Sequence, residues 1–249
     1  MVKPHLIPPR PSLSDGESMM GPDALASAAV QGVRDGMTVG LGTGRTAARA
    51  IYALARRAAE ERLDLHCVAT NRATEELART LGLPLRELPA VGRVDYLFDG
   101  ADEIDESLRM LKGRGGAMTR EKIVAQAAAR RVYLIQSGKL VAHLGETAPL
   151  PIETMRHSLT ALRPALRALE LNGSIRLNSD GTTYETDSGN PIIDAPLPPG
   201  IDVVRLGAAL DGIVGIVGHG LFLTEADVIL IEDNEGRVSR RVRVTRAWR

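Results

Sequence analysis

The chain has 249 residues, a formal net charge of zero and a pI of about 7.0, so its overall charge indicates neither a nucleic-acid groove nor a basic membrane face. We expect no nucleic acid and no membrane among its partners. Cys67 is the single cysteine, which excludes an intrachain disulfide and fits a reducing, cytoplasmic location. This length suits one large domain, or one domain with a smaller companion.

Residues 1–20 are rich in Pro and Ser and predict a flexible tail. A helix over residues 23–34 and a strand over 37–41 follow. The strand runs into the Gly-rich loop Gly40–Thr46, and an Ala-rich helix over 46–60 begins at once. A strand, a glycine loop and a helix N-terminus together favour the binding of an anion such as phosphate.

The same loop does not match the nucleotide-binding motifs. It has no Gly-Lys-Ser/Thr ending, and Arg45 stands where a dinucleotide loop has its third glycine. The next predicted strand, residues 63–69, ends without an acid for a ribose. We therefore expect no dinucleotide and no other cofactor. A glycine turn that only lets the strand and helix pack together is the alternative interpretation.

A second stretch combines acids, a lysine and glycines. A predicted buried strand over residues 94–98 leads into the acidic segment DGADE, which starts at Asp99. Lys112 then opens the loop KGRGG, and Thr119 is a candidate cap for a helix with Glu121 in its first turn. These side chains would meet beyond the carboxyl end of a strand, where open α/β sheets bind ligands.

Strands and helices alternate up to a strand over residues 131–136, which predicts a parallel sheet. The pattern changes near Pro149. The elements expected beyond it are strands over 150–154 and 174–177, helices over 157–170 and 202–211, a hairpin turn at 187–190 and a strand over 213–217.

We therefore predict an α/β fold, with a Rossmann-like parallel sheet domain and an inserted, smaller α+β (ferredoxin-like) lid domain. The main domain is expected over residues 21–148 and 219–249, and the lid over 149–218. The segments expected to return to the main sheet are 221–222, 226–232 and 238–244.

The order of several motifs resembles ribose-5-phosphate isomerase type A over roughly residues 23–237. The resemblance implies an aldose–ketose isomerase that interconverts D-ribose 5-phosphate and D-ribulose 5-phosphate through an enediol, without a metal, as a homodimer or homotetramer. The motifs that carry it are Gly40–Gly44, Asp99–Glu103, Leu111–Gly113, Thr119–Lys122, Thr186–Asn190 and Gly220–Phe222.

The resemblance also implies roles for particular residues. Glu121 matches the base that carries the proton between adjacent carbons, and Lys112 stabilises negative charge on the sugar oxygen. Asp99 and Asp102 would hold sugar hydroxyls or assist ring opening. The implied substrate-binding residues are Gly42, Thr43, Gly44, Arg45, Thr46, Gly100, Ala101, Gly113, Arg114, Gly115 and Lys139.

Each of these residues also has a simpler interpretation. An Asp beside Gly commonly caps a turn, Lys112 can be a solvated loop residue, and Glu121 can complement its helix dipole. The order and spacing of the whole set favour the functional interpretation. No metal-ligand spacing is found among the histidines, which we expect to be structural or surface residues: His5, His66, His143, His157 and His219.

The chain departs from the family pattern at four positions. Arg45 replaces a usual Ser, Pro22 stands at the place of a substrate-contacting lysine, and Gln136 and Gly138 alter the segment before Lys139. An isomerase of a different sugar or sugar phosphate therefore stays a second hypothesis. A non-catalytic sugar-phosphate sensor is a third, and a coenzyme A transferase is a weaker fourth.

Overall fold

The computed structural model describes residues 23–243. The predicted tail over residues 1–20, and Pro22, lie outside the described residues. Within residues 23–243 no helix is both long and apolar enough to cross a bilayer.

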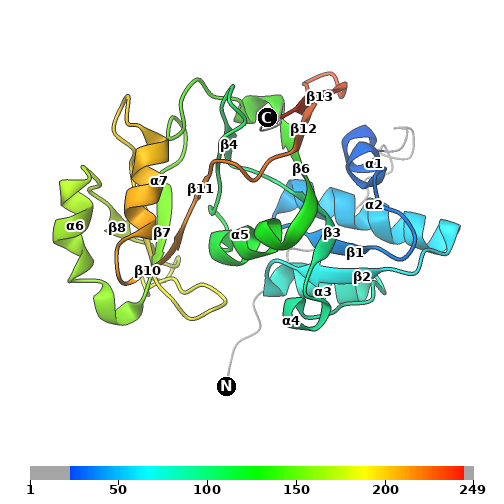
Figure 1. Ribbon diagram of the computed structural model, residues 1–249, viewed down its shortest axis with the longest axis horizontal. Helices are drawn as coiled ribbons and strands as arrows, with labels where there is room; N and C mark the ends of the chain where they lie inside the picture. The colour runs from blue at the N-terminus through cyan, green and yellow to red at the C-terminus, as the bar shows by residue number, and fades with distance from the viewer. Residues whose placement is uncertain (1–22, 244–249) are drawn as a thin grey trace, which may run out of the picture.

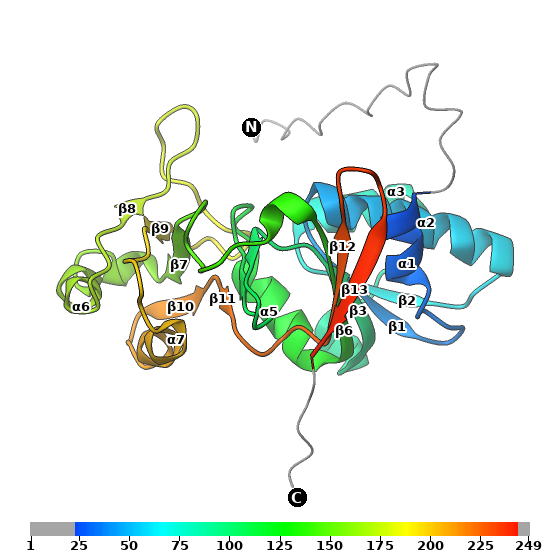
Figure 2. The ribbon, with the colours of Figure 1, turned by 90° about the horizontal axis from the view of Figure 1, so that it is seen from above.

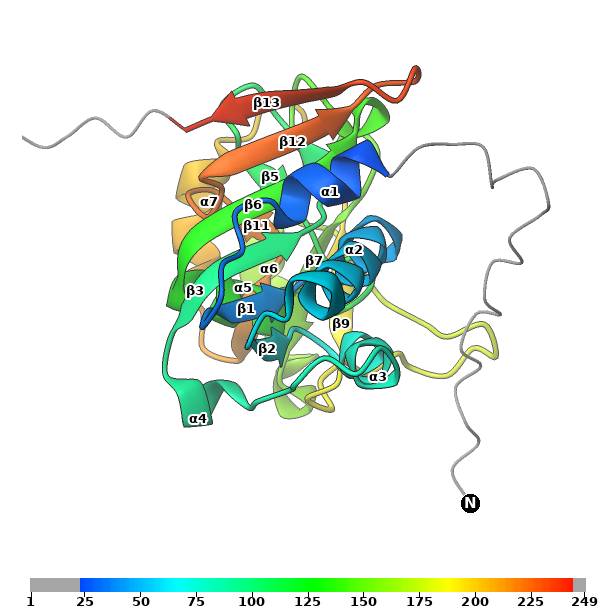
Figure 3. The same ribbon diagram turned by 90° about the vertical axis from the view of Figure 1, so that its right-hand side faces the viewer.

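The centre of the molecule is a six-stranded sheet in the order β13-β12-β6-β3-β1-β2 (Figure 3). Its five neighbouring strands from β12 to β2 are parallel, and β13 is an antiparallel edge strand. Strands covered on both faces are apolar along most of their length, as the sequences VDYLFD and VILIE show. The bounds are β1 Thr38–Leu41, β2 His66–Ala69, β3 Val94–Asp99, β6 Ala128–Gln136, β12 Val228–Glu232 and β13 Val238–Val242.

Helices cover both faces of this sheet. The helices α1, α2 and α3 lie on one face, and α5 lies on the other, between the main sheet and the rest of the chain (Figures 1 and 3). In α2, Ala47, Ala50, Ile51 and Leu54 are buried, which is the spacing of one helix face turned to a core. The bounds are α1 Ala24–Val30, α2 Arg45–Glu61, α3 Arg72–Thr80, α4 Leu88–Val91 and α5 Met118–Ala127.

The strand order places a topological switch point between β1 and β3. From β1 the chain moves outward to β2 and then returns to the other side of β1 to form β3. Connections leave the carboxyl ends of these two strands in opposite directions, and the crevice between them is the usual ligand site of open α/β sheets. Gly42 follows β1 and Asp99 ends β3, so the two predicted motifs meet there.

A second, antiparallel sheet has the order β10-β7-β9-β8 and carries α6 and α7. Its chain order of β-α-β-β-α-β is that of the split β-α-β, or ferredoxin-like, motif. We call the segment from β7 to β10, residues 150–219, the insert; it lies beside α5 (Figures 1 and 2). The bounds are β7 Leu150–Thr154, α6 Leu162–Ala168, β8 Ser174–Ile175, β9 Ile192–Ala195, α7 Val203–Asp211 and β10 Ile216–His219.

The predicted fold class is confirmed: a parallel Rossmann-like sheet with a smaller α+β unit inserted between β6 and β12. The exact domain boundaries stay a prediction. Two short 3-10 helices, η2 Ser137–Lys139 and η3 Arg156–Ser158, complete the description.

One prediction about the return to the main sheet is wrong. Leu221–Phe222 forms β11, which pairs with β5 in a separate three-stranded sheet of order β11-β5-β4 rather than with the main sheet. The other members are β4 Glu103–Ile104 and β5 Met110–Leu111, both too short for a sequence pattern to reveal. The small sheet matters because Lys112 follows β5 directly and its N–H donates to the carbonyl of Gly220 at 2.9 Å.

A second correction concerns Thr119. The helix α5 begins at Met118, so Thr119 lies inside its first turn, and the residue at the cap position, Ala117, offers no side-chain acceptor. The backbone N–H of Glu121 donates instead to the carbonyl of Ala117 at 2.9 Å. The predicted helix over 157–170 is also shorter, because η3 occupies its first turn.

Candidate active site

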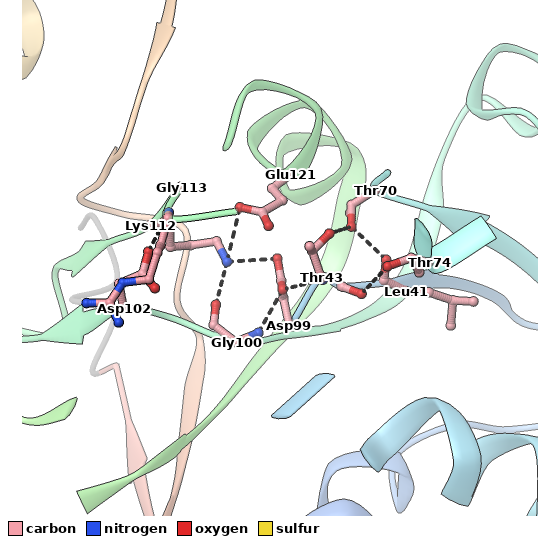
Figure 4. Close-up of polar contacts among 12 residues, drawn as sticks. Leu41, Thr43, Thr70, Thr74, Asp99, Gly100, Asp102, Lys112, Gly113 and Glu121 are labelled. Atoms are coloured by element: carbon pink, nitrogen blue, oxygen red, sulfur yellow. Dashed lines mark hydrogen bonds and ion pairs between the residues drawn. The ribbon is translucent and has the colours of Figure 1, made fainter. Parts of the chain in front are cut away.

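The site begins where the ends of β1 and β3 come into contact. A Cβ atom added to Gly42 would lie 2.2 Å from Asp99 Oδ1 and 2.4 Å from Asp99 Cα, so only glycine permits this approach. Asp99 Oδ1 accepts hydrogen bonds from the N–H of Thr43 at 2.9 Å and of Gly100 at 2.7 Å (Figure 4). The carboxylate is completely buried. Asp99 therefore joins the two loops into one rigid platform.

Lys112 extends from the end of β5 into this platform and is 3% exposed. Its Nζ lies 3.0 Å from Asp99 Oδ2 and also donates to the carbonyl of Gly100 (Figure 4). The rings of Tyr133 and Phe222 have their centres 5.5 Å from the ammonium group, which is cation–π distance. A buried ammonium with these partners stays charged, and the carboxylates of Asp99 and Glu121 outweigh desolvation to raise the pKa of Lys112.

Glu121 reaches the same point from the first turn of α5, and is 4% exposed. Its Oε2 lies 3.2 Å from Lys112 Nζ, but no hydrogen-bond partner for Oε2 is found among the described residues. Burial raises the pKa of Glu121 to about 8, against the opposing attraction of Lys112 and with a further increase from Asp99. Burial therefore leaves the carboxyl group poised to exchange a proton near neutral pH.

A threonine network supports the first loop. Thr43 Oγ1 and Thr70 Oγ1 are 2.7 Å apart, and Thr70 Oγ1 donates to the carbonyl of Leu41 at 2.9 Å. Thr74 Oγ1 donates to the carbonyl of Gly42 at 3.0 Å (Figure 4). Thr70 and Thr74 were not predicted as site residues. The position of Thr70 directly after β2, beside β1 at the same sheet edge, is the signal that could have identified it.

Lys112 contacts both Asp99 and Glu121. The other predicted site residues lie outside this cluster. Asp102 is half-buried, and its Oδ2 accepts from the N–H of Arg114 at 2.9 Å. Arg45 is exposed at the start of α2, and Lys139 is half-buried in η2. Thr46 lies in the first turn of α2, and the remaining predicted positions lie along the three loops around the buried groups: Gly44, Gly100, Ala101, Gly113 and Gly115.

Glu103 illustrates an acid of the same motif with a different role. Its completely buried carboxylate accepts from the N–H groups of Gly145, Thr147 and Ala148 at 2.5 to 2.8 Å. It fixes the segment that leads into the insert and is a structural anchor. Within residues 23–243 no group of three or more His, Cys, Asp and Glu side chains is arranged to hold a metal ion.

Two aromatic residues around Lys112 were also not anticipated. Tyr133 was expected only as part of a buried strand, and Phe222 as part of a returning strand. Their positions against Lys112 depend on β6 and β11 meeting in space, which no local pattern records. Burial raises the pKa of Tyr133 well above its ordinary value, so its hydroxyl stays neutral.

The fold and site define a class of protein: an α/β protein with a buried carboxyl group beside an ammonium group at a sheet switch point, an arrangement that suits proton transfer. Comparisons with known proteins give the family. Residues 66–236 match the model of ribose 5-phosphate isomerase A (phosphoriboisomerase A). The ribose-5-phosphate isomerase A of Roseiflexus sp. (strain RS-1) is 44% identical over 214 residues, covering 86% of this chain and 92% of that protein.

A second relative, the ribose-5-phosphate isomerase A of Synechococcus sp. (strain JA-3-3Ab), is 42% identical and covers 86% of this chain and 93% of its own length. The solved ribose 5-phosphate isomerase A of Methanocaldococcus jannaschii superposes with a TM-score of 0.83 at 36% identity, over 88% of this chain and 96% of that one. A D-ribose-5-phosphate isomerase in complex with phospho-erythronic acid gives a TM-score of 0.84 at 32% identity, over 88% and 96%. The chain therefore belongs to the ribose 5-phosphate isomerase A family and is an isomerase, which confirms the resemblance.

Proposed function

We propose that the protein interconverts D-ribose 5-phosphate and D-ribulose 5-phosphate through an enediol, with Glu121 as the base. The observation that carries this proposal is the buried contact of Lys112 with both Asp99 and Glu121 at the switch point. The relatives described above, which are named ribose-5-phosphate isomerases, support the same reaction.

The reaction requires one proton to move between two carbons. In the open-chain aldose, ionised Glu121 removes the proton from C2, and the C1 aldehyde oxygen takes up the electron pair as an enediolate. The proton of the C2 hydroxyl passes to the C1 oxygen, which leaves the negative charge on the C2 oxygen; the same carboxyl group then returns its proton to C1 as the C2 oxygen forms the carbonyl group, which gives the ketose. A carboxyl group with a pKa of about 8 both accepts and returns a proton readily near neutral pH.

Lys112 supplies the positive charge that the enediolate needs. Its ammonium lies 3.2 Å from Glu121, the proposed base. When Glu121 removes the proton from C2, the oxygen on the neighbouring carbon, C1, is therefore close enough to the ammonium to be stabilised by it. Asp99 keeps that ammonium charged and fixed in position. Since Asp99 is completely buried, with two backbone N–H groups bonded to Oδ1 and the Lys112 ammonium 3.0 Å from Oδ2, we assign it to organising Lys112 and the first loop rather than to holding sugar hydroxyls.

Asp102 suits the contact to the sugar better. It is half-buried, and the bond from Arg114 occupies Oδ2, while Oδ1 accepts no hydrogen bond from residues 23–243. We assign it to a sugar hydroxyl. The phosphate would lie at the exposed start of α2, where Gly44, Arg45 and Thr46 present the helix N-terminus and a guanidinium group. Lys139 is the further cation assigned to the substrate.

We also propose a homodimer or homotetramer, as the family resemblance implies, and a cytoplasmic location, which the single cysteine, Cys67, supports. Light scattering at micromolar concentration tests the assembly, and a monomer would contradict it.

The experiment that tests the reaction is a steady-state isomerisation assay. Ribose 5-phosphate should be converted with a higher kcat/KM than other aldose phosphates and free aldoses in a panel. Phospho-erythronic acid, which a relative binds, should inhibit competitively. A higher kcat/KM with a different aldose would transfer the function to that sugar, and no turnover of any member would contradict the isomerase assignment.

A further inference from the structure

The insert contacts the catalytic loop through an unusual set of bonds. The loop Lys112–Gly116 presents three successive carbonyl groups to the insert, and each of them accepts a hydrogen bond from it. Arg176 donates from one terminal nitrogen to the carbonyls of Gly113 and Arg114, both at 3.0 Å. The hydroxyl of Tyr184 donates to the carbonyl of Gly115 at 3.0 Å.

Arg176 is itself held rigidly. Its Nε and second terminal nitrogen donate to the two carboxylate oxygens of Asp194 on β9, at 2.8 and 2.6 Å. The side chains of Arg176 and Asp194 are 15% and 21% exposed. This bidentate pair fixes the plane of the guanidinium group, so its remaining nitrogen points at the loop with little freedom.

Tyr184 completes the clamp by packing on Arg176 and on the loop backbone. The guanidinium carbon of Arg176 lies 5.6 Å from the centre of its ring. A Cβ atom added to Gly116 would lie 2.3 Å from the Tyr184 hydroxyl oxygen, and Gly116 also has a φ of +76°. The loop therefore follows its path because glycine leaves room for the tyrosine.

We propose that Arg176 and Tyr184 are positioning residues, which hold the Lys112–Gly116 loop by its carbonyl groups and thereby set the position of the Lys112 ammonium. The inference rests on the proposed function of Lys112 and deepens it. It assigns the insert a part in catalysis: the antiparallel sheet fixes one catalytic side chain of the main domain from outside.

The kinetic test compares Arg176→Lys with Arg163→Lys. Lysine at 176 keeps a charge beside Asp194, but its three donors lie on a single nitrogen, so it cannot make the bidentate pair with Asp194 and also bond both loop carbonyls, which needs four bonds. We expect kcat to fall about tenfold to a hundredfold, because a displacement of about 1 Å at a catalytic group has effects of that size. Arg163 donates to the carbonyl of Gly173 within the insert and does not touch the loop, so its replacement should leave kcat unchanged. A fully active Arg176→Lys protein would overturn the proposal.

A pH profile separates a positioning role from simple stabilisation of the fold. The charged and titratable groups that face Glu121 are Lys112 after β5, Asp99 at the end of β3, Asp102 after β3, and Tyr133 from β6. If the loop moves Lys112 away, Glu121 loses the cation that stabilises its charge, and the acidic limb of kcat/KM moves to higher pH. Arg163→Lys should leave that limb in place. An unshifted limb in Arg176→Lys would mean that Lys112 has not moved.

A measurement without substrate distinguishes this proposal from the proposed function. The N–H groups of Arg114 and Gly116 are bonded to Asp102 and Gly113, both at 2.9 Å. Tyr184→Phe should accelerate their hydrogen exchange and lower kcat about threefold to tenfold, whereas Tyr52→Phe on the exposed side of α2 should do neither. Faster exchange in a protein that turns over no ribose 5-phosphate would support the clamp and reject the function; unchanged exchange in an active enzyme would reject the clamp alone.

Discussion

The two sides of the active site differ in burial. The cluster of Lys112, Asp99 and Glu121 is at most 4% exposed, and its ammonium lies within 3.2 Å of both carboxylates. The loop at the start of α2 is open, with Gly44 and Arg45 exposed. Low dielectric strengthens charge interactions and shifts pKa values, whereas an exposed cation mainly attracts and holds an anion. The buried side should therefore govern kcat, and the exposed side should govern KM.

The largest effect is expected from Glu121→Gln. The change keeps the size of the side chain but removes the proton acceptor, so kcat should fall by at least about 10²–10⁴-fold while KM changes much less. Steady-state kinetics give both values. Glu225→Gln, at another buried acid that is 9% exposed, is the matched control and should retain activity. If Glu121 only interacted favourably with the helix dipole, Glu121→Gln would lower the free energy of unfolding by about 0.3–1 kcal/mol and leave turnover unchanged.

Lys112→Met tests the other member of the buried pair. Removing one donor to a developing oxyanion costs about 10²–10³-fold in kcat. The change also leaves Asp99 and Glu121 buried without their cation, and breaking such a pair destabilises proteins by about 3–5 kcal/mol. Urea denaturation and kinetics at low temperature separate the two losses. A stable variant with nearly normal kcat would contradict the role of Lys112.

The pH dependence of the wild-type enzyme follows from the raised pKa of Glu121. The base works when ionised, so kcat/KM should rise with pH and level off above the pKa of about 8, far from the ordinary glutamate value of about 4.3. A kcat/KM that does not change with pH up to about pH 8 would mean that the titrating group is not buried as described.

Stability should change in the opposite direction with pH. Because the folded-state pKa is raised, protonated Glu121 favours the folded state below the unfolded pKa of about 4.3, and this contribution is lost as pH rises towards about 8. Glutamine does not ionise, so the Glu121→Gln protein does not lose this stability as pH rises. Its melting temperature relative to wild type should therefore increase between about pH 5 and about pH 9. A difference that stays constant with pH would contradict the burial of a titrating carboxyl group.

On the exposed side we expect an effect on KM and not on kcat. If Arg45 binds the substrate phosphate, Arg45→Ser should raise KM about tenfold to a hundredfold and leave kcat nearly unchanged, since a hydrogen bond to a charged group contributes about 1.5–3 kcal/mol. Arg56→Ser, at an exposed position further along α2, is the control. Improved kcat/KM for ribose 5-phosphate would instead show that Arg45 restricts the site, and no change would show that it points away.

The sequence predicted the parts of the molecule that depend on local pattern and motif order. Alternating apolar strands and helices indicated the main sheet, and the order of Asp99, Lys112 and Glu121 identified the buried cluster. The Thr119 cap was wrong because the cap position is Ala117 and α5 starts at Met118, two residues before the start that a Thr119 cap requires. The three-stranded sheet was missed because two-residue strands carry no periodicity.

Contacts between distant segments were also beyond prediction. The aromatic rings of Tyr133 and Phe222 meet Lys112 only after β6 and β11 are in place. The clamp of Arg176 and Tyr184 joins residues more than 60 positions apart. The sequence also left open whether burial or the helix dipole controls the charge of Glu121, because burial depends on the whole tertiary structure.

The central claim is that Glu121 moves the proton between the two carbons. Its most direct test is solvent exchange of the sugar in deuterium oxide, followed by NMR, for wild type and folded Glu121→Gln. The wild-type enzyme should incorporate deuterium at the carbon beside the carbonyl during turnover, and the variant should lose this incorporation together with its turnover. Continued incorporation at the wild-type rate in Glu121→Gln would contradict the assignment of the base.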